Sequence, residues 1–234
     1  GAATFIVNVT QSPNYPGEVN EREFRSIWNQ AWFNSFRSAS GLFRYAKRKN
    51  IDSLKRYANM TKELALSFPQ KNGFFPGLIA TEMKEVEIAG KKYWRSAGWD
   101  THYFGNSNRN PYTWNAKESP YHVLDMSYTA LLMLDWYQEL EKDPRLLDYA
   151  VRYADALINI QRTDGYFPAW LDLQDQNDMD ILSKSPESAM SVSFLLKLYQ
   201  ISKLEKYKES ALKALDVIEK EIVPIGRWED FETY

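Results

Sequence analysis

A recurring helix end is the feature that most constrains the fold of this chain. Residues 161–170 read Gln-Arg-Thr-Asp-Gly-Tyr-Phe-Pro-Ala-Trp, and residues 70–76 read Gln-Lys-Asn-Gly-Phe-Phe-Pro. A weaker third copy spans residues 224–231. In each copy a glycine, which can adopt a positive φ, follows a helical pattern and stops it. Because a recurring helix end implies a recurring unit, the sequence predicts a helical repeat protein.

The predicted unit is a helical hairpin. Apolar residues at a 3.6-residue period predict helices near 21–49, 52–68, 122–142, 145–161, 187–203 and 206–222. Asp52 and the Ser-Pro pairs at 119–120 and 185–186 are the predicted helix starts. Helices 122–142 and 187–203 are apolar on nearly every side, which is typical of inner helices, and each precedes an amphipathic outer helix. The sequence therefore predicts three hairpin units, at about 21–79, 120–171 and 186–231.

Two segments lie outside this helical pattern. Residues 85–88 and 92–95 flank Ala89-Gly90-Lys91, and this pattern predicts a small β-hairpin near 85–96. Residues 98–120 form a long irregular segment rich in aromatic residues, and loops of that length within a compact domain are commonly functional. We therefore expect a single all-α domain over residues 1–234, with a small β-hairpin insertion.

Composition excludes several classes of function. The net charge of -2 gives no reason to expect a nucleic acid partner, and no apolar run is long enough to predict a membrane span. Cysteine is absent, which excludes disulfides and thiolate chemistry and fits either a reducing compartment or bacterial export. The chain opens Gly-Ala-Ala without a methionine, as after removal of a targeting segment. These features favour a periplasmic or secreted bacterial location over the cytoplasm.

The alternation of inner and outer helices resembles an alpha/alpha toroid, as in the six-hairpin glycosidases and related polysaccharide lyases. The helix end Gln161-Arg162-Thr163-Asp164-Gly165-Tyr166 is also similar to the helix-end motif of the terpenoid cyclases. The acidic Asp-x-Asp-Asp motif of those cyclases is absent, because the nearest string, Asp178-Met179-Asp180, lacks the final Asp. The toroid resemblance implies a carbohydrate-active protein, a glycoside hydrolase or polysaccharide lyase acting on a bacterial or plant glycan.

Three hairpins would form only part of such a ring. The resemblance therefore implies a partial toroid: a fragment, or an array completed by a homo-oligomer or by a missing toroid half. Helix 187–203 carries Phe194, Leu195 and Tyr199 and shows no polar face. Because large exposed apolar patches are uncommon on soluble monomers, we expect a patch beside this helix that another chain covers.

In a toroid the loops that enter the inner helices gather at one end, and here those loops are rich in aromatic rings and carboxylates. Aromatic faces stack on sugar rings, and two opposed carboxylates can act as acid and base on a glycosidic bond. The candidate catalytic residues are Asp100, His102, Tyr103, Glu187 and Asp230. The candidate substrate-binding residues are Trp99, Phe104, Asn108, Arg109, Trp114, His122, Tyr166, Trp170 and Trp228. The alternative is that the rings only pack the loops, that Glu187 only caps its helix and that both histidines are ordinary loop residues.

Three readings of the chemistry stay open. A hydrolase would use a carboxylate pair, whereas a lyase would use His102 or Tyr103 as proton acceptor, with Asn106, Asn108 or Arg109 to neutralise a uronate. A partial ring that lacks one catalytic group would instead be a non-catalytic glycan- or protein-binding module. No cofactor or metal is predicted, because zinc-ligand spacing and nucleotide-binding motifs are absent and the acidic run 172–180 departs from the EF-hand pattern.

Overall fold

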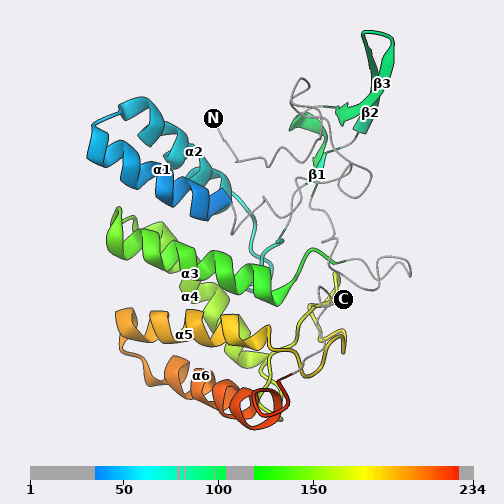
Figure 1. The fold of residues 1–234 in the computed structure, drawn as a ribbon. Helices are drawn as coiled ribbons and strands as arrows, with labels where there is room; N and C mark the ends of the chain where they lie inside the picture. Colours follow the sequence, from blue (N-terminus) through cyan, green and yellow to red (C-terminus); the bar gives the residue numbers. More distant parts are fainter. Residues whose placement is uncertain (1–34, 78–79, 82, 98, 104–118, 227–234) are drawn as a thin grey trace.

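The computed structural model describes residues 35–77, 80–81, 83–97, 99–103 and 119–226. The described helices form three antiparallel hairpins, α1(Ser35–Lys49) with α2(Asp52–Leu66), α3(Val123–Glu139) with α4(Pro144–Asn159), and α5(Ser188–Ser202) with α6(Glu205–Val217). A π-helical turn, η4(Ile218–Ile222), extends α6. The hairpins stack in chain order, so that α3 packs between α1 and α5, and α4 between α2 and α6 (Figure 1). The predicted hairpins are confirmed, while residues 21–34 of the first predicted helix lie outside the described residues.

The helix starts differ from the prediction by up to three residues. Asp52 is the first residue of α2, after Ile51, so it is not the N-cap. α3 begins at Val123 and α5 at Ser188, downstream of the two Ser-Pro pairs. Each serine instead closes a short turn, since Ser119 Oγ accepts from the backbone N–H of Tyr121 and Ser185 Oγ from that of Glu187, both at 3.1 Å. Around residue 122 the backbone is extended because it pairs with another loop, which delays α3.

The small β-hairpin is confirmed. Strands β2(Met83–Ile88) and β3(Lys91–Ser96) pair antiparallel, with Ile88 opposite Lys91. The two residues between the strands, Ala89 and Gly90, have φ of 51° and 74°, as a tight primed turn requires. A second short antiparallel pair joins β1(Ala80–Thr81) to β4(His102–Tyr103). β4 comes directly after the 3-10 turn η2(Trp99–Thr101).

The core lies between the two rows of helices. Trp136 of α3 is fully buried against Phe36 and Phe43 of α1, with ring centroids 5.4 and 5.2 Å apart. On the other side of α3, Ser127 bonds both Ser191 of α5 at 2.9 Å and the Tyr153 hydroxyl of α4 at 2.8 Å. This buried polar link places α3 at the centre of the array. No helix among the described residues has the length and apolarity that crossing a bilayer requires.

The recurring helix end proves to be the joint between consecutive hairpins. The Gln70 side chain donates to the Gly73 carbonyl at 3.1 Å and to the Tyr149 carbonyl of α4 at 3.0 Å. Gln161 repeats this pattern one hairpin later, donating to the Gly165 carbonyl at 2.8 Å and to the Ser210 carbonyl of α6 at 3.0 Å. Each glutamine therefore ties the loop after one outer helix to the backbone of the next outer helix.

The glycines of the two joints are required by close backbone contact. Gly73 has φ of 89°, and a Cβ placed on it would lie 2.6 Å from both the Arg152 carbonyl oxygen and the Ala156 Cβ of α4. Gly165 has φ of 103°, and a Cβ there would lie 3.0 Å from the Lys213 carbonyl oxygen of α6. Only glycine combines this backbone conformation with this closeness. The repeat found in the sequence is thus a packing requirement.

The third copy differs from the other two. Gly226 has a positive φ of 62°, but no described residue lies within 4 Å of a Cβ placed there. Residues 227–231 of this copy lie outside the described residues.

The expected apolar patch beside α5 is largely absent at the residues that predicted it. Phe194 and Leu195 are fully buried within the chain. Tyr199 is half-buried, and its hydroxyl donates to Glu205 at 2.9 Å, with the ammonium groups of Lys203 and Lys208 about its ring. α5 therefore turns its large apolar residues toward α3 and α4, and the homo-oligomer stays a prediction.

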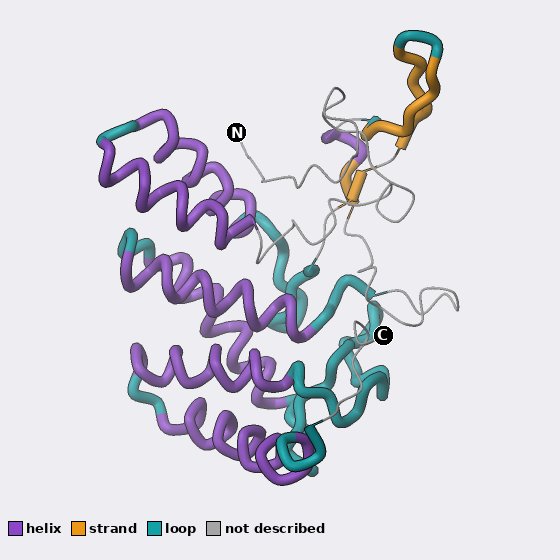
Figure 2. Tube along the Cα trace, in the orientation of Figure 1, coloured by secondary structure: helices purple, strands orange, loops and turns teal. Residues whose placement is uncertain are grey.

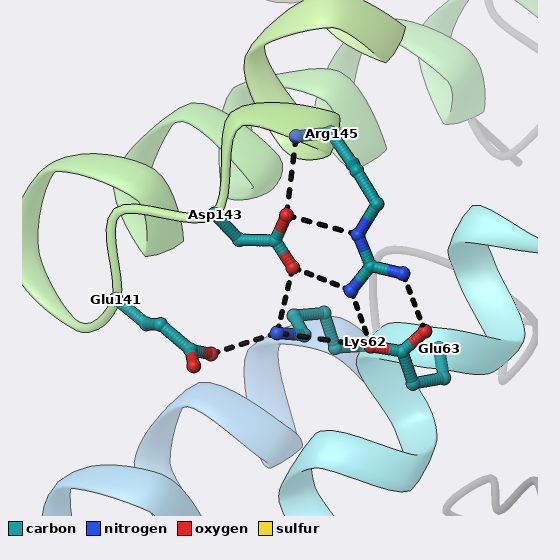
Figure 3. Close-up of polar contacts among 5 residues, drawn as sticks. All are labelled: Lys62, Glu63, Glu141, Asp143 and Arg145. Carbon is teal, nitrogen blue, oxygen red and sulfur yellow. Dashed lines mark hydrogen bonds and ion pairs between the residues drawn. The ribbon is translucent and has the colours of Figure 1, made fainter.

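An ionic cluster joins the first hairpin to the second (Figure 3). The ammonium group of Lys62, only 4% exposed, lies 2.7 Å from Glu141 and 2.9 Å from Asp143. Arg145 bonds Asp143 and makes a two-pronged contact with Glu63 at 2.6 and 2.9 Å. Burial disfavours the charge on Lys62, but the two carboxylates outweigh it and raise the pKa of Lys62 above its usual value. The hydrogen bonds from Arg145 lower the pKa of Asp143 well below its ordinary range.

Candidate functional site

The long loops gather at one end of the array, which we call the loop end. The turns within each hairpin are short and lie at the opposite end, whereas residues 67–77, 119–122 and 160–187 connect one hairpin to the next (Figure 2). The N-termini of α3 and α5 both open toward the loop end (Figure 1). Polar and ionisable residues at the starts of α3 and α5 therefore lie at the same end of the array.

Backbone hydrogen bonds fix the loops against one another. The N–H of Val123 donates to the Ala169 carbonyl at 2.9 Å, and the N–H of Leu171 donates to the Tyr121 carbonyl at 3.1 Å. His122 and Trp170 thus face each other across a short antiparallel bridge. The loop after the first hairpin joins them, because the Gly77 N–H donates to the Pro120 carbonyl at 2.6 Å.

His122 is the centre of a buried charged triad. Its Nε2 lies 2.9 Å from Glu187 Oε2, and its Nδ1 lies 3.1 Å from Asp125 Oδ2. The second contact is a close charge contact rather than a well-aligned hydrogen bond. The side chains of His122 and Asp125 are 1% and 4% exposed, whereas that of Glu187 is 12% exposed. The triad therefore runs from the protein interior to a carboxylate that reaches solvent.

Trp170 covers one face of the imidazole ring. The two rings stack in parallel, with centroids 4.0 Å apart and planes 7° apart. A cation over an indole face is attracted by the electron-rich ring, typically by about 2 kcal/mol when both are desolvated. Trp170 is fully buried, so it shields the cation from water.

The triad holds His122 in its charged form. Burial lowers the pKa of His122, but the negative charges of Glu187 and Asp125 and the hydrogen bond to Glu187 outweigh burial and raise it to about 9. An imidazolium donates from both nitrogens, which matches the carboxylates on either side. The site therefore carries an imidazolium cation between the carboxyl groups of Glu187 and Asp125 at neutral pH.

The structure brings together Glu187 and His122, which the sequence placed in different groups. Glu187 does not cap α5, because its side chain makes no cap hydrogen bond and turns to His122 instead. Trp170 packs against the same histidine.

The interpretation of Tyr166 and Trp170 as substrate-binding residues needs correction. Both residues are 0% exposed, because Tyr166 belongs to the main hydrophobic core and Trp170 packs with Ala169 and Ile181 in a smaller apolar cluster. Neither ring offers a free face to a sugar, and the alternative that these rings pack the loops is the better description for this pair.

The remaining candidates are elsewhere or outside the described residues. Asp100, His102 and Tyr103 are exposed and belong to the η2–β4 segment, which pairs with β1. β1 lies well apart from the start of α5 (Figure 1). The backbone of Trp99 is described as part of η2, but its side chain is not. Phe104, Asn108, Arg109, Trp114, Trp228 and Asp230 lie outside the described residues.

Sequence reasoning missed Asp125. It lies three residues after His122 in the first turn of α3 and is 2% exposed. A carboxylate within a helix that is apolar on nearly every side is a signal, because a buried charge requires a partner. The position of Asp125 in the sequence contains that signal, but it does not show that His122 is the cation that pairs with the carboxylate.

The acidic run 172–180 is built as a turn. Asp172 accepts three backbone N–H groups at 2.8 Å, from Gln174, Asp175 and Asn177. Burial opposes its charge, yet these bonds lower the pKa of Asp172. Within the described parts of the chain, no group of three or more His, Asp or Glu side chains is arranged to hold a metal ion.

A hollow of about 360 Å³ lies between α2 and α4, away from the triad. Its lining is Glu63, Leu66, Ser67, Arg145, Asp148, Tyr149 and Arg152. Arg145, a charged residue of this lining, is already paired with Glu63 and Asp143, so we do not propose the hollow as the functional site.

The array is similar to the crystal structure of a possible member of the GH105 family from Salmonella enterica serovar Paratyphi A, with a TM-score of 0.54 and 17% sequence identity. The fold is that of an alpha/alpha toroid. The match covers 85% of this chain and 46% of the other, so the chain spans less than half the length of that structure. No protein-family model matches the chain, and no curated protein matches it. The resemblance to toroid glycosidases is supported at the level of fold, and that to the terpenoid cyclases is unsupported.

Proposed function

We propose that this chain is a carbohydrate-active protein that acts on a bacterial or plant glycan at the loop end, as a glycoside hydrolase or polysaccharide lyase. The observation that carries the proposal is Glu187, a partly exposed carboxylate held by a buried imidazolium at 2.9 Å. It stands at the start of an inner helix in a fold shared with a possible GH105 member. Active sites concentrate charged groups of this kind in partly buried positions.

In this proposal Glu187 is the proton acceptor or charge-stabilising group. Its Oε2 is held by His122, which leaves Oε1 for a substrate hydroxyl, a water or a ring proton. Hydrolysis of a glycosidic bond requires a second carboxyl group as acid. Asp100 and Asp230 remain the candidates for that role, and His102 or Tyr103 the proton acceptors of the lyase alternative. A periplasmic or secreted location, where glycans are met, goes with this proposal.

The second candidate is a non-catalytic glycan-binding module. It is favoured by the fact that the triad offers solvent only one carboxylate, because Asp125 is buried behind His122. Such a module would use Glu187 to accept sugar hydroxyls without breaking a bond.

A polysaccharide screen separates these candidates. The wild-type chain is incubated with pectic, xylan, mannan and glucan polymers while reducing ends, unsaturated uronate absorbance and retention in affinity electrophoresis are measured. New reducing ends without absorbance identify a hydrolase, and both together a lyase. Retention alone identifies the binding module.

The variants Glu187→Gln and Glu219→Gln then locate the site. Glu219 is an exposed carboxylate on η4 and serves as the matched control. We expect Glu187→Gln to lose at least 100-fold in turnover, or ten-fold in retention for a module, and Glu219→Gln to behave as wild type. The proposal would be wrong if both variants gave the same turnover or retention, or if the wild-type chain neither cleaved nor bound any of the polymers.

A further inference from the structure

We propose that Asp125 is a positioning residue, which acts through His122 to hold Glu187 as a hydrogen-bond acceptor with one oxygen facing solvent. This inference rests on the proposed role of Glu187 at the loop end. Asp125 does not reach solvent, so its contribution passes through the imidazole ring.

The geometry is a line of three side chains from two helix starts. His122 is the N-cap residue of α3 and Asp125 lies in its first turn, while Glu187 precedes α5. The carboxylates of Asp125 and Glu187 approach opposite nitrogens of the same ring, at 3.1 and 2.9 Å. An ionised carboxylate can accept hydrogen bonds but cannot donate them. Both ring nitrogens must therefore carry protons for both contacts to be favourable.

The ring has no freedom to leave this arrangement. Trp170 covers one face, and the pairing of residues 121–123 with 169–171 fixes the backbone at His122. With the ring fixed, the charge of Asp125 beside Nδ1 helps to keep the ring doubly protonated, and a doubly protonated ring donates a charge-assisted hydrogen bond from Nε2 to Glu187.

The loop after the first hairpin closes over Asp125. A Cβ placed on Gly77 would lie 3.2 Å from Asp125 Cβ and 3.4 Å from Asp125 Oδ2. On the α4 side, the Tyr153 hydroxyl donates to the Val123 carbonyl at 3.2 Å, and burial raises the pKa of this tyrosine far above its usual value. The charged groups that face His122 within the described chain are therefore Asp125 and Glu187, with neutral Tyr153 behind.

Removing the charge of Asp125 has a definite consequence. In Asp125→Asn, one of the two negative charges that stabilise the imidazolium is lost, and His122 releases a proton at lower pH. The Glu187 carboxylate then keeps the remaining proton on Nε2, and the asparagine amide can turn its NH2 group toward Nδ1. The hydrogen bond to Glu187 becomes a neutral one in place of a charge-assisted one, so Glu187 is held less firmly.

Nitrogen NMR measures this without any substrate. The chain has only two histidines, so protein labelled with ¹⁵N-histidine gives few signals, and His122→Gln assigns them. In the wild type we expect His122 to be doubly protonated at pH 7.5 and to titrate near the pKa of about 9. In Asp125→Asn we expect the titration midpoint to fall by at least one pH unit, with Nδ1 becoming the unprotonated nitrogen.

Matched variants separate positioning from the loss of any ion pair on α3. Asp135 lies on the same helix and pairs with Lys197 of α5 at 2.6 Å, so Asp135→Asn removes an interhelical ion pair outside the triad. We expect Asp135→Asn to leave the His122 titration unchanged. Asp125→Glu, which keeps the charge, should restore at least half of the shift.

The second measurement uses the polymer that gives the strongest response in the polysaccharide screen. Its pH profile should change shape in Asp125→Asn, with turnover or retention falling by ten-fold or more at neutral pH and only slightly in Asp135→Asn. If Asp125→Asn does not fold, Asp125→Glu still tests the inference, because a carboxylate kept at this position must leave His122 doubly protonated at pH 7.5.

Two results would overturn the inference. One is a wild-type His122 that is neutral at pH 7.5 or carries its single proton on Nδ1. The other is an Asp125→Asn protein with an unchanged His122 titration. If the NMR results agree with expectation while every polymer is inert, the triad stands and the proposed glycan function fails, so the two failures are distinguishable.

Discussion

Two ionic clusters join neighbouring hairpins around a buried cation, but their surroundings differ. In the Lys62 cluster the cation meets Glu141, which is 45% exposed, and Asp143 has a second partner in Arg145. In the His122 triad the cation lies beneath a stacked indole and between two carboxylates, of which the more exposed is only 12% accessible.

This difference indicates that the Lys62 cluster stabilises the fold, whereas the His122 triad is a candidate functional site. In the Lys62 cluster, loss of Lys62 leaves Asp143 and Glu63 paired with Arg145 and leaves Glu141, which is exposed, to be solvated. In the His122 triad the imidazolium lies between two carboxylates and under one indole ring, and a pKa of about 9 in place of 6.5 puts its charge under the control of these neighbours. Groups whose protonation is tuned in this way are typical of functional sites.

The largest effect is expected from His122→Ala. It leaves the buried Asp125 without the imidazolium and opens a void beneath Trp170. Removing one partner of a buried ion pair typically costs about 3–5 kcal/mol. Urea denaturation should show a loss of this size, and a loss below about 1 kcal/mol would mean that the triad is no more demanding than the Lys62 cluster.

The second effect is a dependence of stability on pH. The pKa of His122 is raised in the folded state, so the stabilisation is complete below pH 6.5 and is lost as pH rises through about 9. A shift of this size corresponds to about 3 kcal/mol. The pKa of Lys62 is also raised, but from an ordinary value of 10.5, so the Lys62 ammonium stays charged over the same pH range.

The free energy of unfolding, measured in urea at several pH values from 6 to 9.5, tests this sign. The wild type should lose stability over that range, and His122→Gln should lose markedly less. A similar slope in both proteins would show that other groups cause the pH dependence.

A smaller effect is expected from Lys62→Met. The methionine fills the space of the lysine stem, Arg145 still pairs with Asp143, and Glu141 can turn to water. We expect the free energy of unfolding, measured in urea, to fall by about 1–2 kcal/mol. This is less than the cost of removing one partner of a buried ion pair when the other partner is left unpaired. Lys220→Met, which removes an exposed pair with Asp216, is the control and should be neutral.

The smallest effect on stability is expected from Glu187→Gln. The amide oxygen can still accept from His122 Nε2, so the hydrogen bond survives while the charge is lost. We expect about 1 kcal/mol of destabilisation, in the range of a single net hydrogen bond. A loss as large as that of His122→Ala would make Glu187 a structural anchor first, and would weaken its assignment as the reacting carboxylate.

Part of the candidate site could be predicted from the sequence. Glu187 and His122 were both selected, because they lie at inner-helix starts in loops rich in aromatic residues. Their contact joins residues 65 positions apart and could not be derived from either segment alone. Trp170 was selected for its ring, yet only the pairing of its loop with residues 121–123 shows that the ring is buried under a histidine.

The sequence by itself determined the three hairpins, the β-hairpin and the two Gln–Gly joints. These follow from local rules: apolar periodicity selects helices, and a glycine with positive φ ends them. The tertiary structure alone decided the charge of His122, the burial of Trp170 and the part played by Asp125. Those properties depend on which loops lie against each other, since a pKa and an exposed fraction belong to the surroundings of a side chain and not to its type.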